Sequence, residues 1–304
     1  MKKTKLGKSN LEVSQVALGC MSLGTNADQA TNIIDQALDL GINYLDTADL
    51  YDKGQNEEIL GQAIKHKRDQ LILATKVGNH LNKDGSWFWD PRKAYIKEQV
   101  KTSLKRLQTD YIDLYQLHGG TIEDPVDETI EAFDELVQEG VIRYYGISSI
   151  RPNVIREFAK KSNMVSVMMQ YSLLDRRPEE EALQHLNNHD ISVVTRGSLA
   201  KGMLSTNGLQ IATNKGEQGY LDYDAATITN TLTQLQDLLH DGQTLTGLAL
   251  QYVLNQQAVT SIVAGASSIE QLKENAEALN QHFSPEQFEK AKQLTKANLY
   301  AQHR

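Results

Sequence analysis

Short apolar runs alternate with longer amphipathic segments along almost the whole of the 304-residue chain. The runs fall at 16–19, 42–45, 71–74, 111–117, 144–147, 165–169, 191–194 and 262–264. Apolar residues at helical spacing follow nearly every run, near 33–38, 57–64, 96–107, 126–140, from 152, and at 179–188, 228–239, 245–254 and 270–279. This alternation is typical of βα units around a parallel sheet.

Eight such units predict an α/β fold of the (β/α)8 TIM-barrel type rather than a doubly wound sheet. The chain is slightly longer than the roughly 250 residues common for this barrel. The surplus fits an N-terminal β-hairpin with its turn at 7–10, Gly-rich loops at 201–220 and extra C-terminal helices. Asp90 followed by Pro91 predicts the start of a helix. No linker-like tract interrupts the pattern, so we expect residues 1–304 to form a single domain.

Composition excludes several classes of function. The 31 Lys and Arg residues against 39 Asp and Glu give a formal net charge of -8, which argues against a nucleic-acid partner. No stretch reaches the roughly 18 consecutive apolar residues of a membrane span, and the first residues lack the apolar segment of a signal peptide, so we expect no membrane partner and a cytoplasmic location. Cys20 is the one cysteine and the eight His are scattered, so neither a disulfide nor a metal site is expected.

Polar side chains stand where three successive apolar runs end, which is where barrel active sites lie. Asp46 ends the second run, Lys76 the third and His118 the fourth, while Tyr51 follows Asp46 by five residues. A lysine cation beside a phenol makes the phenolic proton easier to release, and a carboxylate keeps the lysine charged. The four residues therefore predict an acid–base site. Taken singly, each has a structural alternative: an ion pair between strands, a rim aromatic and a satisfied loop histidine.

The motifs around these residues resemble those of the aldo-keto reductase family. They are GINYLDTADLY at 41–51, LATK at 73–76, DLYQLH at 113–118, the segment 140–148, and Glu274-Asn275. The resemblance covers nearly the whole chain and implies a bacterial NADPH-dependent reductase of aldehydes, ketones or reactive dicarbonyls. It implies the same four catalytic residues, with Tyr51 as proton donor, Lys76 and Asp46 supporting it, and His118 orienting the carbonyl.

The resemblance also implies how the nicotinamide is held. Ser148 and Gln170 match family positions, whereas Ser149 stands where the family carries Asn. Arg196 replaces the aromatic residue that often stacks on the nicotinamide, and its guanidinium can either stack on the ring or reach a phosphate. The chain holds no G-x-G-x-x-G motif, so a Rossmann site is not expected.

The remaining cofactor contacts implied by the resemblance lie at the loop after the first run, at 197–202 and at 265–275. They are Cys20, Met21, Gly197, Ser198, Leu199, Gly202, Gly265, Ser267, Gln271, Glu274 and Asn275. Relatives carry basic residues where Gly265 and Gln271 stand, and those residues grip the 2′-phosphate. Here Ser267, Gln271 and a helix N-terminus would bind it instead, and we expect NADPH over NADH.

A small-molecule carbonyl compound is the expected substrate. Met21, Trp87 and Trp89 are expected to line its pocket, with both tryptophans in the loop 84–90. Buried aromatics that merely anchor that loop are an equal alternative. Two other functions stay open: a nucleotide-binding regulatory protein like the potassium-channel β subunits, and a lyase whose Lys76 forms a Schiff base. No apolar surface stripe stands out, so a monomer is expected, with a homo-oligomer as the alternative.

Overall fold

Eight parallel strands close into a barrel in the computed structural model, which describes residues 1–82 and 84–304. Around the barrel the strands run in the order β3 (Val16–Gly19), β4 (Tyr44–Asp46), β5 (Ile72–Val77), β8 (Ile112–Leu117), β9 (Ile142–Ser148), β10 (Ser166–Gln170), β11 (Ser192–Arg196) and β12 (Val259–Gly265). Strand β12 pairs with β3 and closes the circle. The predicted (β/α)8 barrel is thereby confirmed, while a single domain over 1–304 stays a prediction.

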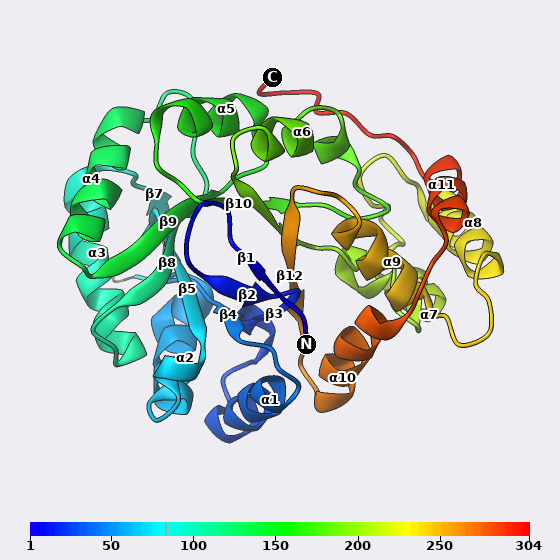
Figure 1. Ribbon diagram of the computed structural model, residues 1–304, viewed down its shortest axis with the longest axis horizontal. Coiled ribbons are helices and arrows are strands. Elements are labelled where there is room, and N and C mark those ends of the chain that lie inside the picture. The colour runs from blue at the N-terminus through cyan, green and yellow to red at the C-terminus, as the bar shows by residue number, and fades with distance from the viewer. Residues whose placement is uncertain (83) are drawn as a thin grey trace.

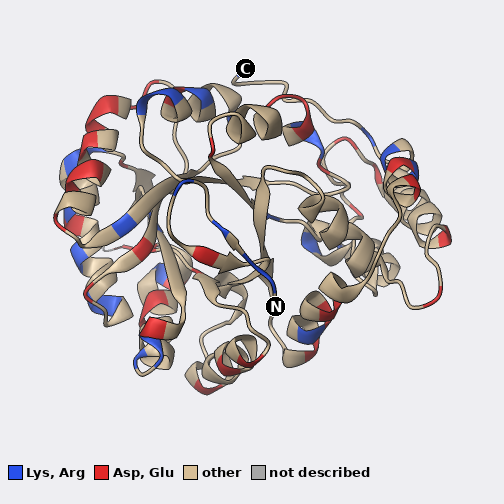
Figure 2. Cartoon of the chain, viewed as in Figure 1, with Lys and Arg blue, Asp and Glu red and all other residues tan. Residues whose placement is uncertain are grey.

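Helices surround these strands (Figure 1). They are α1 (Ala27–Asp39), α2 (Gln55–Ile64), α3 (Lys93–Leu107), α4 (Val126–Gln138), α5 (Pro152–Lys161), α6 (Ala182–Asn187), α7 (Gly208–Lys215), α8 (Ala225–Asp237), α9 (Leu245–Leu254), α10 (Ile269–Glu277) and α11 (Pro285–Leu294). Helix α1 buries Ile33, Ile34 and Ala37 on one face, and the side chain of its N-cap Asn26 accepts from the Gln29 N–H. Acidic and basic residues are concentrated on these outer helices, and the strands between them are largely without charge (Figure 2).

Strand register aligns the carboxyl ends of the strands at one rim. Gly19 is paired with Asp46, Lys76 with Gln116, and Gln170 with Arg196. The last residues of β3, β4, β10 and β11 therefore face the same end of the barrel as the segment that follows β8. This is the end where (β/α)8 proteins carry their functional side chains.

The predicted N-terminal hairpin covers the opposite end of the barrel. Strands β1 (Lys3–Lys5) and β2 (Glu12–Ser14) pair antiparallel and lie across the barrel in Figure 1. Leu6, Leu11 and Val13 are buried in the core cluster that fills the barrel interior. Gly7 has φ +52°, and a Cβ there would lie 2.2 Å from the Val165 carbonyl oxygen, so this turn requires glycine.

Three elements differ from the sequence-based expectations. Helix α3 begins at Lys93 rather than at Pro91, because its N-cap Arg92 is still extended, with φ −66° and ψ 143°. The Asp90 carboxylate accepts from the Arg92 N–H and guanidinium just before the helix. Strands β6 (Asn79–Leu81) and β7 (Trp87–Trp89) form a hairpin where a loop was expected. Helix α7 occupies part of 201–220, which was also expected to be loop.

Among the residues that the structure describes, no helix is both long enough and apolar enough to cross a membrane.

Candidate functional site

The four residues predicted from strand ends lie together at the carboxyl rim. The Lys76 Nζ is 2.5 Å from Asp46 Oδ1 and 3.4 Å from the Tyr51 hydroxyl oxygen. The Tyr51 and His118 rings meet edge to face, with centroids 5.9 Å apart. Asp46 and Lys76 are buried, whereas Tyr51 and His118 are partly exposed. The two rings therefore present their polar groups to a ligand, and the ion pair lies behind them.

The segment after β4 places the Tyr51 ring beside Lys76. The Thr47 N–H donates to the Ala74 carbonyl, and the Asp49 N–H to the Lys76 carbonyl, so the chain continues along β5 after its own strand ends. Tyr51 then opens a short 3-10 turn that ends at Gly54. Gly54 has φ +93°, and the nearest atom to a Cβ there would be Arg106 Cζ at 2.3 Å. The turn that carries Tyr51 thus needs glycine at its end.

Lys76 is held as a cation. Burial opposes its charge, but the Asp46 carboxylate and Tyr51 outweigh that effect and raise the pKa of Lys76. Its three N–H bonds have three acceptors: Asp46 Oδ1, the Tyr51 hydroxyl and, at 2.7 Å, the Thr47 carbonyl. The other Asp46 oxygen accepts from Gln116 Nε2 at 3.1 Å. The ammonium is therefore fixed in direction and points one donor at the phenol oxygen.

His118 is an uncharged imidazole at neutral pH. Burial, together with the positive charges of Lys76 and Arg196, lowers the pKa of His118 to about 3. Its Nδ1 has no hydrogen-bond partner among the described residues. A neutral imidazole carries one N–H donor, which is the group that a carbonyl oxygen accepts from.

Gln170, at the end of β10, forms hydrogen bonds with three side chains at the same rim. Its Nε2 donates to Asp175 Oδ2 at 2.8 Å and to the Tyr220 hydroxyl at 3.2 Å, while its Oε1 accepts from Arg196 Nη1 at 3.0 Å. Arg196 is exposed beside it. Ser148 ends β9 partly exposed, and the Ser149 N–H donates to the Met168 carbonyl. An amide, two hydroxyls and a guanidinium therefore stand at the ends of three neighbouring strands, and this donor set fits a nicotinamide carboxamide.

The loop after β11 and the start of α10 hold the other predicted cofactor residues. Gly197, Gly265, Ser267 and Gln271 are exposed, Leu199, Gly202 and Glu274 are partly exposed, and Ser198 and Asn275 are buried.

Helix α10 presents its N-terminus at this edge. The Ser268 hydroxyl caps the helix, and Gln271 Oε1 accepts from the Ser267 N–H at 2.9 Å. The Glu274 carboxylate accepts from the Thr206 hydroxyl at 2.6 Å and also from Thr246. Helix N–H groups favour an anion here, with no basic side chain at position 265 or 271.

Four residues predicted near the nicotinamide and substrate differ in accessibility. Cys20 is fully buried, and burial raises the pKa of its thiol, so the side chain is an unreactive neutral group. Its assignment as a cofactor contact stays a prediction. Met21 is 66% exposed and Trp87 56% exposed, whereas Trp89 packs against the core.

Sequence reasoning missed the residues that support the four. Gln116 lies on β8, two residues before His118, which directly follows the strand. Because side chains two residues apart share a strand face, this spacing could have identified Gln116 from the sequence. No comparable spacing identified the polar residues behind Tyr51, which are Asp49, Glu57 and Arg106. There Glu57 accepts from Thr75 at 2.7 Å and pairs with Arg106 at 3.3 Å. Burial and the Glu57 carboxylate raise the pKa of the neighbouring Asp49, which favours its neutral form.

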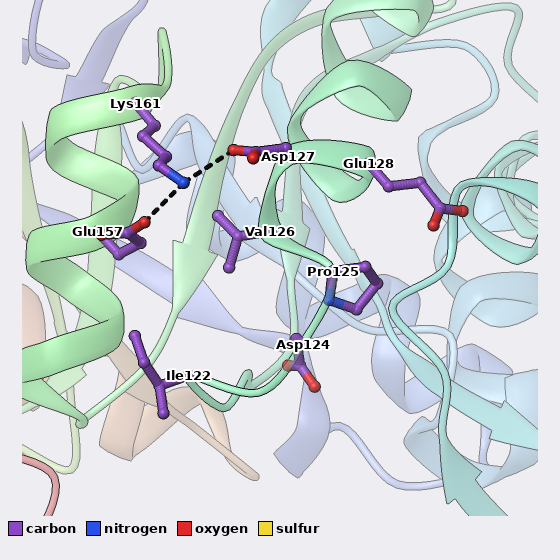
Figure 3. Close-up of a pocket in the computed structure, with 8 residues that line it drawn as sticks. All are labelled: Ile122, Asp124, Pro125, Val126, Asp127, Glu128, Glu157 and Lys161. Carbon is purple, nitrogen blue, oxygen red and sulfur yellow. Dashed lines mark hydrogen bonds and ion pairs between the residues drawn. The ribbon is translucent and has the colours of Figure 1, made fainter.

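Other surface features offer less. Among the described residues, no group of three or more His, Cys, Asp or Glu side chains could hold a metal ion. A shallow groove runs between α4 and α5, where Lys161 bridges Asp127 and Glu157 and Asp124 lies at the start of the helix (Figure 3). Lys161, Asp127 and Glu157 form ion pairs with each other, and no residue of this groove belongs to the four at the rim.

Comparisons with known proteins agree on one family. The model of the aldo/keto reductase family matches residues 15–296. The uncharacterized oxidoreductase YqkF of Bacillus subtilis is 58% identical, with all of both chains covered. The NADH-specific methylglyoxal reductase of Escherichia coli is 33% identical over 93% of this chain and 95% of that protein. The holo form of aldo-keto reductase AKR11C1 from Bacillus halodurans superposes with a TM-score of 0.93 at 56% identity, covering 100% of this chain and 99% of that one.

Proposed function

The chain belongs to the aldo/keto reductase family, and from that premise we propose that it reduces aldehydes, ketones or reactive dicarbonyls with NADPH. One observation carries the proposal: the buried Lys76 ammonium lies 3.4 Å from the Tyr51 hydroxyl and 2.5 Å from Asp46. A cation so placed stabilises the phenolate that remains once Tyr51 has given up its proton. Similarity to a methylglyoxal reductase supports dicarbonyls within the substrate class.

When bound, NADPH would supply the hydride that the carbonyl carbon takes up. Tyr51 transfers its hydroxyl proton to the carbonyl oxygen, so that an alcohol forms and Tyr51 regains a proton from water. The neutral His118 donates an N–H hydrogen bond to the same oxygen and stabilises negative charge as it develops. Lys76, held by Asp46, donates a hydrogen bond to the Tyr51 oxygen from which the proton leaves.

The cofactor site uses the rim opposite Tyr51. Gln170, Ser148 and Ser149 would hold the carboxamide, with Arg196 beside the ring, and Ser198, Leu199 and Gly202 would line the pyrophosphate. Ser267, Gln271 and the α10 N-terminus would receive the 2′-phosphate. Neutral donors bind this group more weakly than a guanidinium does, so the preference for NADPH over NADH is modest.

The rival functions find less support. A Schiff base needs a neutral amine, whereas Lys76 is paired with Asp46 and has a raised pKa. A purely regulatory nucleotide-binding role does not require the arrangement of Tyr51, Lys76 and His118. We further propose a cytoplasmic monomer.

Replacement of Tyr51 by Phe tests the proposal, because the variant keeps the ring and removes the proton. We expect carbonyl-dependent loss of NADPH absorbance, with methylglyoxal and an aromatic aldehyde, to fall by about 100-fold or more, while the Kd for NADPH stays unchanged. Tyr144→Phe, which removes a hydroxyl bound to Asn10 at the far end of the barrel, is the control. Equal turnover in wild type and Tyr51→Phe would rule out Tyr51 as the donor.

A further inference from the structure

Trp89 ends β7, and its indole lies beside Gly78 and Gly119, the glycines that follow β5 and β8. Its Nε1 is 3.0 Å from both carboxylate oxygens of Asp124. The ring packs against the main core, whereas its neighbour in the same hairpin, Trp87, is 56% exposed. The indole therefore has one fixed position, set by packing and by a charge-assisted hydrogen bond.

Two glycines leave the space that this ring fills. Gly78 follows Lys76 by two residues, and Gly119 directly follows His118. A Cβ at position 78 would lie 2.5 Å from Trp89 Cζ3, and one at position 119 would lie 3.2 Å from the same atom. Both glycines have positive φ, +127° and +144°. One edge of the indole thus rests on the backbone just beyond both Lys76 and His118.

Asp124 connects the indole to the loop that follows His118. Its carboxylate accepts from the Thr121 N–H at 2.6 Å and from the Thr121 hydroxyl at 2.9 Å. Arg151 donates to the Gly120 carbonyl at 2.5 Å, which fixes the same loop from α5. Figure 3 shows Asp124 beside Pro125, away from the Lys161 ion pairs. Asp124 is therefore bound to the loop on one side and to the hairpin on the other.

We infer that Trp89 and Asp124 are positioning residues for His118, and this inference rests on the proposed function. The hydrogen bond between them holds the β6–β7 hairpin against residues 118–121, and the indole prevents the Gly119–Gly120 backbone from moving toward the hairpin. That backbone sets where the His118 ring meets the carbonyl oxygen. Glycines with positive φ would otherwise leave it free to move.

Trp89→Phe and Asp124→Leu test this inference. Because small displacements of a catalytic group cost large factors in rate, we expect each to lower kcat about 10- to 100-fold. The Kd for NADPH should stay unchanged, and the double variant should be no slower than the worse single variant, since both remove one link. Asp124→Asn keeps an oxygen acceptor and should restore most of kcat. Asp127→Asn, in the first turn of the same helix, is the control.

The outcomes separate the two proposals. A wild-type protein that reduces no carbonyl compound removes the proposed function and this inference with it. An active wild type whose Trp89→Phe and Asp124→Leu variants keep their kcat, or change KM alone, removes only the inference. Independent, multiplying losses in the double variant would also overturn it. If one of these two variants fails to fold by near-UV circular dichroism, the other decides alone: a kcat at least about 10-fold lower, with an unchanged Kd for NADPH, supports the inference, and a wild-type kcat contradicts it.

Discussion

The surroundings of His118 hold its imidazole in the uncharged form. Its imidazole is packed beside Lys76 with Arg196 also nearby, and both charges add to the effect of burial on its pKa. The position at the end of the fourth run was readable in the sequence, because strand ends in a barrel meet at one rim. Its uncharged state was not readable, since burial and the approach of Arg196 depend on how distant segments pack. The same holds for the neutral form of Asp49 behind Tyr51, which depends on its burial beside Glu57.

The lowered pKa of His118 makes a prediction about acid stability. The group binds a proton in the unfolded chain below its ordinary pKa of about 6.5 but in the folded chain only near pH 3. The unfolded state therefore binds more protons between these values, and stability falls as the pH falls through this window. Between pH 7 and pH 4 the protonation of this group should lower the free energy of unfolding by about 3 kcal/mol.

Urea unfolding of wild type and His118→Gln at pH 7 and pH 4 measures this cost. From pH 7 to pH 4, the free energy of unfolding should fall by about 3 kcal/mol less in the variant than in wild type. Identical pH dependence in both proteins would mean that His118 is not protected from protonation in the folded chain.

At the level of elements, short segments whose shape depends on distant contacts were the hardest to predict. The β6–β7 hairpin consists of two three-residue strands, held by the stacking of His80 between Phe88 and Tyr95 and by Trp89. Local sequence favoured a polar loop there because Asn82, Asp84 and Gly85 are turn residues. Helix α7 lies among glycines and threonines with weak helix preference, so tertiary packing rather than propensity forms it. The long amphipathic helices, by contrast, followed from apolar spacing alone.

Helix α10 carries a prediction about cofactor choice. Gln271 lies in its first turn and accepts from Ser267, so an arginine here would place a guanidinium beside the expected 2′-phosphate. Gln271→Arg should tighten NADPH binding by about tenfold, since a hydrogen bond to a charged group contributes about 1.5–3 kcal/mol. NADH binding should change little.

Fluorescence titration with both nucleotides measures these constants, and Gln138→Arg at the exposed end of α4 controls for added charge. Equal tightening of NADH and NADPH, or none, would place the 2′-phosphate elsewhere.

In the whole molecule, the N-terminal hairpin and the candidate site lie at opposite ends of the barrel. The hairpin β1–β2 buries Leu6, Leu11 and Val13 at the amino ends of the strands, whereas the four polar residues stand at the carboxyl ends. Barrel closure was predictable because eight similar units leave few other arrangements. The end of the barrel that the N-terminal hairpin covers was not predictable, because it depends on contacts such as those of Gly7 with Val165 and Ser192.

This separation predicts that Leu11→Ala destabilises the protein without altering its chemistry. Leu11 is 2% exposed, and removing its side chain should lower the free energy of unfolding by about 2–5 kcal/mol. KM and kcat at 25 °C should remain those of wild type. Leu299→Ala, at a side chain that is 57% exposed, should change stability by less than about 0.5 kcal/mol. A Leu11→Ala protein with wild-type stability would show that the hairpin does not contribute to the core.

The most direct measurement for the central claim follows the hydride itself. The protein is given NADPH with deuterium at both C4 positions and an aldehyde, and the product is analysed by mass spectrometry. We predict an alcohol with one deuterium on the former carbonyl carbon, formed by wild type and about 100-fold more slowly by Tyr51→Phe. An alcohol without deuterium, or no alcohol from any aldehyde, ketone or dicarbonyl although NADPH binds, would contradict it.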